Sequence, residues 1–127
     1  MKISFIGLGK LGLPLACCLA EAGNEILAID NNTETIKTLK NGDLPIIEPG
    51  LDELYESNKK NIYDYTVSYE RAIEETDCSI ILVNTQELDG GYVPGRVEDV
   101  LKELSLHLKN SKKNYHLFIL SSTVLPG

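Results

Sequence analysis

Three features that would assign the chain to other classes of protein are missing from its 127 residues. No uninterrupted apolar run reaches the roughly 20 residues that span a membrane, and the N-terminus lacks the separate basic region and cleavage site of a secretory signal. Lysine and arginine are too few, 12 against 19 acidic residues, to predict the basic face that nucleic-acid phosphates require. We therefore expect neither a membrane nor a nucleic acid as partner, and we attribute the net charge of −7 to a solvated surface.

The chain also has little cysteine, and its three cysteines fit neither a disulfide framework nor a zinc site. Their number is odd, and they lack the paired spacing of metal ligands; they are Cys17, Cys18 and Cys78. No histidine lies close to them in sequence to act as a base, so we predict that all three are buried packing residues. We predict no metal site and no catalytic residue, and the free thiols favour a cytoplasmic location.

The sequence does contain a glycine turn directly after its first predicted strand. Residues 3–6 are a short apolar run, and residues 7–12 then read G-x-G-x-x-G. In a dinucleotide-binding fold, Gly7 permits the tight turn, Gly9 lets the backbone approach a pyrophosphate, and Gly12 lets the next helix pack closely on the strand. The N-terminus of that helix faces the phosphates with unpaired N–H groups and a partial positive charge.

The residues after the turn complete a β-α-β unit that ends in a carboxylate. Gly23 is typical of a helix end, and a strand over 25–29 leads to Asp30. Asp30 stands roughly 20 residues beyond the glycines, where the fingerprint places the carboxylate for the ribose hydroxyls. Asn31 and Asn32 follow, without the cation that a 2′-phosphate needs, so the pattern predicts NAD rather than NADP. Five residues recur at helical spacing between turn and strand: Leu11, Leu15, Cys18, Leu19 and Ala22.

Helices and strands continue to alternate beyond Asp30. Asn31 is expected to cap a helix whose third residue is Glu34, with Ile36 and Leu39 facing inward. The pattern further predicts helices over 51–57, 69–75 and 96–108, strands over 65–68, 79–83 and 116–120, and a Gly/Pro-rich loop over 86–95. Residues 1–127 are therefore expected to form one α/β domain, a Rossmann-type doubly wound parallel sheet in three layers, α/β/α.

Polar residues follow two of the predicted strands, at the edge where ligands bind in such a sheet. Asn84 and Thr85 come after the strand over 79–83, and Ser122 and Thr123 come after the strand over 116–120. These side chains are suited to bind the nicotinamide ribose or the pyrophosphate, but serine and threonine at strand ends also make purely local hydrogen bonds. Spacing alone leaves both interpretations open.

Four segments resemble successive signatures of the UDP-glucose/GDP-mannose dehydrogenase family. They are residues 7–16 (GLGKLGLPLA), 45–51 (PIIEPGL), 83–85 (VNT) and 122–127 (STVLPG), which together span the chain. The first is shared with many NAD proteins, whereas the loop over 45–51 and the last segment are specific in combination. By sequence, that loop lies along the ligand face of the domain or is a rigid surface turn.

The resemblance implies a nucleotide-sugar 6-dehydrogenase, which oxidises a UDP- or GDP-hexose to the uronic acid in two NAD-dependent steps through a covalent cysteine adduct. It places Asp30 at the adenine-side ribose and Thr85 and Thr123 at the coenzyme. Members of the family continue through a central helix and a second α/β domain that holds the sugar nucleotide and the catalytic cysteine. Residues 1–127 are then expected to be the NAD-binding part of a longer, dimeric enzyme. The pyrophosphate would lie against Gly7, Leu8, Gly9, Lys10, Leu11 and Gly12.

Two other functions stay open. A hydroxyacid or phosphogluconate-type dehydrogenase begins with a similar glycine turn, but it accounts poorly for residues 45–51. A non-catalytic dinucleotide-binding module is favoured by departures from the family pattern. Gln86 stands where the family commonly has proline, Lys10 where an aromatic or small residue is frequent, and Thr35 where a basic residue is often near.

Overall fold

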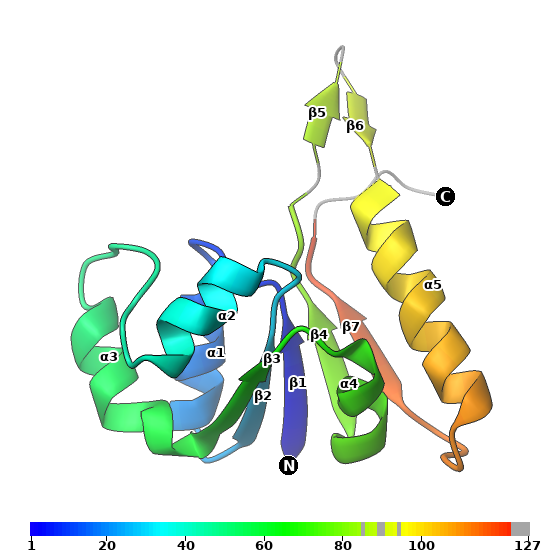
Figure 1. Cartoon of the computed structure of the whole chain (residues 1–127), viewed down its shortest axis with the longest axis horizontal. Helices are drawn as coiled ribbons and strands as arrows, with labels where there is room; N and C mark the ends of the chain where they lie inside the picture. The colour runs from blue at the N-terminus through cyan, green and yellow to red at the C-terminus, as the bar shows by residue number, and fades with distance from the viewer. Residues whose placement is uncertain (85, 89–90, 94, 123–127) are drawn as a thin grey trace.

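A computed structural model describes residues 1–84, 86–88, 91–93 and 95–122, and its centre is a five-stranded sheet (Figure 1). All neighbouring strands pair in parallel, in the order β3-β2-β1-β4-β7. Because β1 is the middle strand and the chain winds outward from it in both directions, the carboxyl ends of β1, β2 and β4 meet at one edge. The strands are β1 (Lys2–Ile6), β2 (Glu25–Ile29), β3 (Ile62–Thr66), β4 (Cys78–Ile81) and β7 (Leu117–Leu120).

Helices cover both faces of this sheet, which confirms the predicted doubly wound, three-layer fold. Alternate residues of β1 enter different cores: Phe5 packs with α1, α2 and α3, whereas Ile6 packs with α4 and α5. Figure 1 shows the two groups of helices on opposite sides. No helix in the described residues has both the length and the apolar character to cross a membrane. The helices are α1 (Gly12–Glu21), α2 (Thr33–Lys40), α3 (Leu51–Asn58), α4 (Tyr69–Glu75) and α5 (Gly95–Asn110), with a 3-10 turn η1 (Lys59–Asn61).

The packed face of α1 differs from the expected one. Its buried residues include Leu13, Ala16, Cys17 and Ala20, while Leu11, Leu15, Cys18 and Ala22 are exposed and Leu19 is half-buried. The prediction that Cys18 is buried is therefore wrong, whereas Cys17 and Cys78 are buried as expected. The phase of the helix is set at its start, where Gly12 lies against the backbone of Gly7 and turns small residues towards the sheet.

Several elements also differ in their bounds from the sequence predictions. The strand expected over 79–83 is β4 (Cys78–Ile81), and the helix expected over 96–108 is α5 (Gly95–Asn110). Asn32, not Asn31, caps α2, since its side-chain oxygen accepts hydrogen bonds from the N–H groups of Glu34 and Thr35. β3 begins at Ile62, three residues before the predicted strand, because polar residues of this edge strand interrupt the apolar alternation. The predicted loop over 86–95 contains an antiparallel hairpin of β5 (Gln86–Leu88) and β6 (Gly91–Val93), which Figure 1 shows beyond the carboxyl ends of the sheet.

A short polar chain crosses the interior between β1, β4 and the start of β7. The hydroxyls of Ser4 and Ser79 lie 2.6 Å apart, and Ser79 Oγ lies 2.8 Å from His116 Nε2. All three side chains are buried, and this burial lowers the pKa of His116. Because all three side chains are buried and none lines the cavity at the carboxyl ends of the strands, we assign this polar chain to the core.

Candidate functional site

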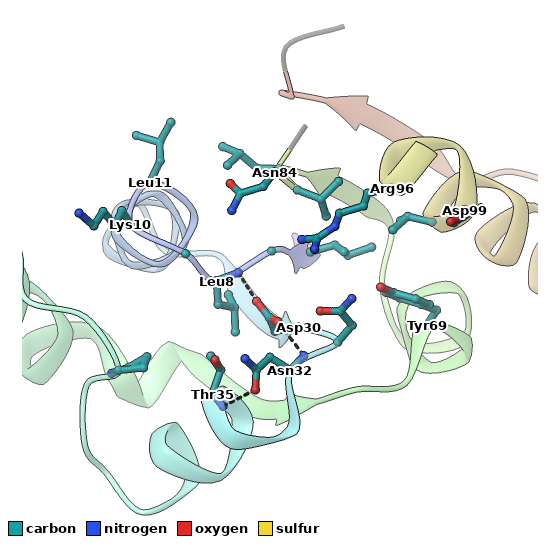
Figure 2. Close-up of a pocket in the computed structure, with 18 of the residues that line it drawn as sticks. Leu8, Lys10, Leu11, Asp30, Asn32, Thr35, Tyr69, Asn84, Arg96 and Asp99 are labelled. Carbon is teal, nitrogen blue, oxygen red and sulfur yellow. Dashed lines mark hydrogen bonds between the residues drawn. The ribbon is translucent and has the colours of Figure 1, made fainter. Parts of the chain in front are cut away.

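A cavity of about 730 Å³ opens at the carboxyl ends of β1, β2 and β4 (Figure 2). Its volume lies within the range of roughly 300–1,000 Å³ typical of cofactor sites. One wall is the glycine turn after β1, the floor includes Asp30 after β2, and the opposite wall combines the end of β4 with the first turns of α5. Pro45 and Ile46 also line it, so the start of the loop over 45–51 lies at this face, while Ile47 is exposed to solvent.

The three glycines of the turn serve three different steric needs. Gly7 has φ +102°, and a Cβ there would lie 2.8 Å from the carbonyl carbon of Leu82. A Cβ on Gly12 would press into the Gly7 carbonyl group, 2.9 Å from its carbon. A Cβ on Gly9 would meet no atom within 4 Å, because Gly9 faces the open cavity. Gly7 and Gly12 thus hold the fold together, while Gly9 leaves room for a ligand.

The start of α1 has no side-chain cap. Leu13 N–H donates to Gly9 O at 3.1 Å and Pro14 has no N–H, so Gly12 N–H is the donor of the first turn left without a partner among the described residues. Leu11 is the N-cap residue of the helix, and no side chain accepts a hydrogen bond from the first helical N–H groups. A helix N-terminus without a side-chain cap leaves donors and the positive end of the helix dipole for an anion. The structure therefore places a phosphate-compatible helix start beside the space at Gly9.

Asp30 links the glycine turn to the start of the segment after β2. Its Oδ2 accepts a hydrogen bond from Leu8 N–H at 2.8 Å, and its Oδ1 accepts one from Asn32 N–H at 2.8 Å (Figure 2). A carboxylate has about four acceptor positions, so each oxygen can accept one further hydrogen bond from a hydroxyl group. Asp30 thus both fixes the glycine turn and offers acceptors to a ribose.

The opposite wall contains residues that the sequence did not indicate. Tyr69 begins α4, and Arg96 and Val100 come from the first turns of α5. Burial raises the pKa of Tyr69, and the carboxylates of Glu103 and Asp30 raise it further, so its hydroxyl stays protonated. Helical spacing predicted α5 itself, but no local motif indicates that the start of this helix faces Asp30.

The structure brings most of the expected coenzyme residues to one cavity. Two of the expected residues, Gly12 and Ser122, do not line the cavity. Gly12 instead packs against the Gly7 backbone of the turn. The Ser122 hydroxyl donates to Val83 O at 2.8 Å and accepts from Val83 N–H at 2.9 Å, which links β7 to β4. Thr85 and Thr123 lie outside the described residues, so their roles stay predictions. The expected residues that line the cavity are Gly7, Leu8, Gly9, Lys10, Leu11, Asp30 and Asn84.

These features fit a dinucleotide. Open space at Gly9, an uncapped helix start and a carboxylate with spare acceptors are what the pyrophosphate and ribose require. NAD would supply the acceptor of a hydride, and the protein would supply binding and orientation. Among the described residues, no cluster of histidine, cysteine or carboxylate side chains has the arrangement of a metal site.

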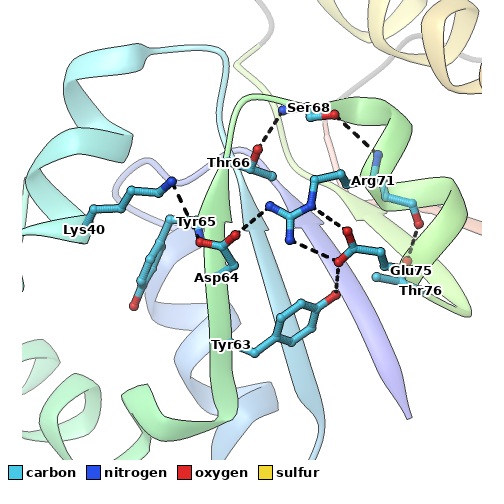
Figure 3. Close-up of polar contacts among 10 residues, drawn as sticks. Lys40, Tyr63, Asp64, Tyr65, Thr66, Ser68, Arg71, Glu75 and Thr76 are labelled. Carbon is cyan, nitrogen blue, oxygen red and sulfur yellow. Dashed lines mark hydrogen bonds and ion pairs between the residues drawn. The ribbon is translucent and has the colours of Figure 1, made fainter.

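A separate cluster of charged groups joins the edge strand β3 to α4 (Figure 3). The Arg71 guanidinium donates to Asp64 Oδ2 and Glu75 Oε1, both at 2.6 Å, and Tyr63 donates its hydroxyl hydrogen to Glu75 Oε2 at 3.2 Å. Burial alone would raise the pKa of Asp64, but the hydrogen bonds from Arg71 and from Tyr65 N–H, together with the charges of Arg71 and Lys40, outweigh it and lower the pKa. The hydrogen bond from Arg71 is also the main cause that lowers the pKa of Glu75. None of these residues lines the cavity, so the cluster stabilises the fold.

Replacing Arg71 by alanine is expected to lower the free energy of unfolding at pH 7 by about 1 kcal/mol, because side chains that are about one-third exposed gain only modestly from ion pairing. The pKa values of Asp64 and Glu75 are lowered in the folded state, so the stabilisation exists above their ordinary values of 3.8 and 4.5. It is lost as the pH falls below those values and through the lower pKa values of the folded state. Urea unfolding at pH 7 and pH 3 measures both effects.

The matched control for Arg71 is Lys59→Ala, which removes the exposed pair with Glu56 and should leave the urea midpoint unchanged. An equal loss of stability at both pH values in the Arg71 variant would mean that packing, and not charge, is responsible.

The fold is a five-stranded, doubly wound parallel sheet, and a glycine turn, an uncapped helix start and Asp30 surround one cavity at its edge. Together these features define a Rossmann-type dinucleotide-binding domain. Comparison with known proteins specifies the class. The family model described as the NAD-binding domain of the UDP-glucose/GDP-mannose dehydrogenase family matches residues 1–127. The chain belongs to this family.

Curated relatives and solved structures agree with this assignment. The chain is 36% identical to a GDP-mannose 6-dehydrogenase from Pseudomonas syringae pv. syringae, with all of the chain and 29% of that protein aligned. A crystal structure of a ternary complex of GDP-mannose dehydrogenase from Pseudomonas aeruginosa superposes with a TM-score of 0.91 at 32% identity, covering all of this chain and 29% of the other. The structure of a UDP-glucose dehydrogenase from Pyrobaculum islandicum superposes with a TM-score of 0.87 at 30% identity, covering 99% of this chain and 29% of the other. The chain thus spans less than a third of the length of these relatives.

Proposed function

We propose that the chain is the coenzyme-binding domain of a nucleotide-sugar 6-dehydrogenase, an enzyme that oxidises a UDP- or GDP-hexose to the uronic acid with NAD. The observation that carries this proposal is the cavity, where the open space at Gly9 and the carboxylate of Asp30 lie at the carboxyl ends of adjacent strands. The relatives that match the whole chain are named for 6-dehydrogenation of GDP-mannose or UDP-glucose.

The proposal assigns coenzyme binding to this chain and the remaining chemistry to residues outside it. None of the three cysteines lines the cavity, and burial raises the pKa of Cys17 to about 11, which makes it a poor nucleophile. We include in the proposal a longer enzyme with a central helix and a substrate domain, its homodimeric assembly and a cytoplasmic location. The longer enzyme is supported by the alignment, in which this chain covers 29% of the length of its relative. The cytoplasmic location is supported by the free cysteines.

Calorimetric titration with NAD and NADP tests the coenzyme assignment directly. We expect NAD to bind and NADP to bind more weakly, because a 2′-phosphate next to the Asp30 carboxylate would meet like charge. Failure to bind NAD, or a preference for NADP, would contradict the assignment.

Replacing Asp30 by alanine is expected to weaken NAD binding by about 1–3 kcal/mol, or about 5- to 150-fold in Kd, through lost charge-assisted hydrogen bonds to the ribose. The Leu8 and Asn32 N–H groups also lose their acceptor, so the turn itself becomes less ordered. Titration of the variant, with circular dichroism to verify its fold, measures the effect.

Asp52→Ala is the matched control for Asp30→Ala, since it removes a carboxylate from the first turn of α3 and leaves the cavity lining intact. An Asp30 variant with unchanged affinity would exclude this carboxylate from the site.

A further inference from the structure

We propose that Arg96 stacks its guanidinium group on the adenine ring of the bound dinucleotide and is a specificity-determining residue of this site. The inference rests on the proposed function, because it takes NAD as the ligand. Arg96 belongs to the first turn of α5, and its side chain points into the cavity between Asn84 and Tyr69 (Figure 2).

The covalent order of the ligand determines which wall the adenine meets. The pyrophosphate fits the turn over 7–12, and the adenine-side ribose fits Asp30. Adenine is bonded to this ribose opposite the carbon that carries the phosphate, so it extends past Asp30, away from the glycine turn. Figure 2 shows Tyr69 and Arg96 on the side of Asp30 away from the glycine turn, and the lining also includes Val83, which follows β4, and Val100 of α5.

The chemistry of this wall suits a flat base. Val83 and Val100 provide apolar surface, and Tyr69 is half-buried beside them. The Arg96 side chain is exposed, and within the part of the chain that the structure describes it makes no ion pair, so its planar face is available. A guanidinium group stacks on an aromatic ring through its flat face and its charge.

Position also separates Arg96 from the other cation of the cavity. Lys10 lies within the glycine turn, where the phosphates are expected, whereas Arg96 lies across the cavity on α5 (Figure 2). A stacking role needs a planar group, which tyrosine also has, whereas an ion pair with a phosphate needs a positive charge, which lysine keeps and tyrosine lacks. This difference makes the role testable.

The experiment compares Arg96→Ala, Arg96→Lys and Arg96→Tyr by calorimetric titration with NAD and with ADP-ribose, which contains the adenine but not the nicotinamide. We expect Arg96→Ala to raise both Kd values equally, by about 3- to 30-fold. Arg96→Lys should recover little of this loss and Arg96→Tyr most of it, because tyrosine restores a planar face. The ratio of the Kd of Arg96→Ala to the Kd of wild type should be the same at 50 and 300 mM KCl.

Lys102→Ala is the matched control, since it removes one positive charge from the exposed side of α5, where Lys102 pairs with Glu98. It should leave both Kd values unchanged. Full recovery of both Kd values by lysine, failure of tyrosine to recover either, or a wild-type-to-variant Kd ratio that collapses at 300 mM KCl would each show an ion pair with a phosphate and overturn the stacking role. An Arg96→Ala variant with wild-type affinity would also overturn it. If the wild-type chain binds neither ligand, the proposed function itself fails.

Discussion

Replacing Gly12 by alanine is expected to lower the free energy of unfolding by about 3 kcal/mol or more. The new Cβ would press into the carbonyl group of Gly7 and lie 3.4 Å from Cε1 of Phe5. The obstacle at Gly7 is backbone that is itself fixed, since Gly7 N–H donates to Ile29 O at 2.8 Å. The start of α1 must therefore move away from the sheet. Urea unfolding followed by circular dichroism measures the loss.

Gly9→Ala is the matched control, because its Cβ would point into open space. We expect its stability to stay within about 0.5 kcal/mol of wild type, while its Kd for NAD rises at least about tenfold as the Cβ enters the space of the pyrophosphate. The two alanines thus separate a fold requirement from a ligand requirement in one turn. Equal loss of stability in both variants would contradict the distinct roles assigned to Gly9 and Gly12.

Replacing Phe5 by alanine is expected to cost about 3–5 kcal/mol of unfolding free energy, a large share of the roughly 5–15 kcal/mol of a typical domain. Phe5 is 1% exposed on the central strand and belongs to the core between the sheet and α1, α2 and α3. The loss combines the transfer of the ring to water with the cavity left under α1. Urea unfolding measures it as a lower midpoint with an unchanged slope.

Two further variants sharpen this result. Ile47→Ala removes an apolar side chain that is 99% exposed, so its stability should stay within about 0.5 kcal/mol of wild type. The double variant Phe5→Ala/Gly12→Ala should be no more stable than Gly12→Ala alone. The main obstacle to a Cβ at position 12 is the Gly7 backbone and not the Phe5 ring. Recovery in the double variant would show that the ring is the real obstacle.

The features that sequence predicted well depend on local patterns. The glycine turn, Asp30 after β2 and the bounds of α4 follow from short-range spacing, and the structure has them where they were expected. What sequence missed depends on contacts between distant segments. The phase of α1 follows from the contact between Gly12 and Gly7, which periodicity does not reveal. Apolar residues recur on two sides of this helix, so spacing alone selected the exposed side.

In the candidate site, too, the part formed by neighbouring residues could be predicted and the part formed by distant segments could not. Its phosphate and ribose wall could be predicted because the fingerprint lies within residues 7–30 of the sequence. The wall with Tyr69 and Arg96 could not, because it forms only when α4 and α5 pack on the far side of β1 and β4. The cap of α2 was misplaced by one residue for a related reason, since the N–H of Asn32 is held by Asp30 while its side chain caps the helix.

The unequal burial of the three cysteines gives the chain a built-in reporter of its opening motions. The sequence contains no tryptophan, so fluorescence offers little for this purpose. Cys18 is on the exposed side of α1, Cys17 is on the buried side of the same helix, and Cys78 is buried in β4. A thiol reagent therefore reacts with Cys18 in the native state, reaches Cys17 when α1 lifts from the sheet, and reaches Cys78 when β4 is exposed. Mass spectrometry of partly alkylated chains can thus time the release of α1 separately from the loss of the sheet.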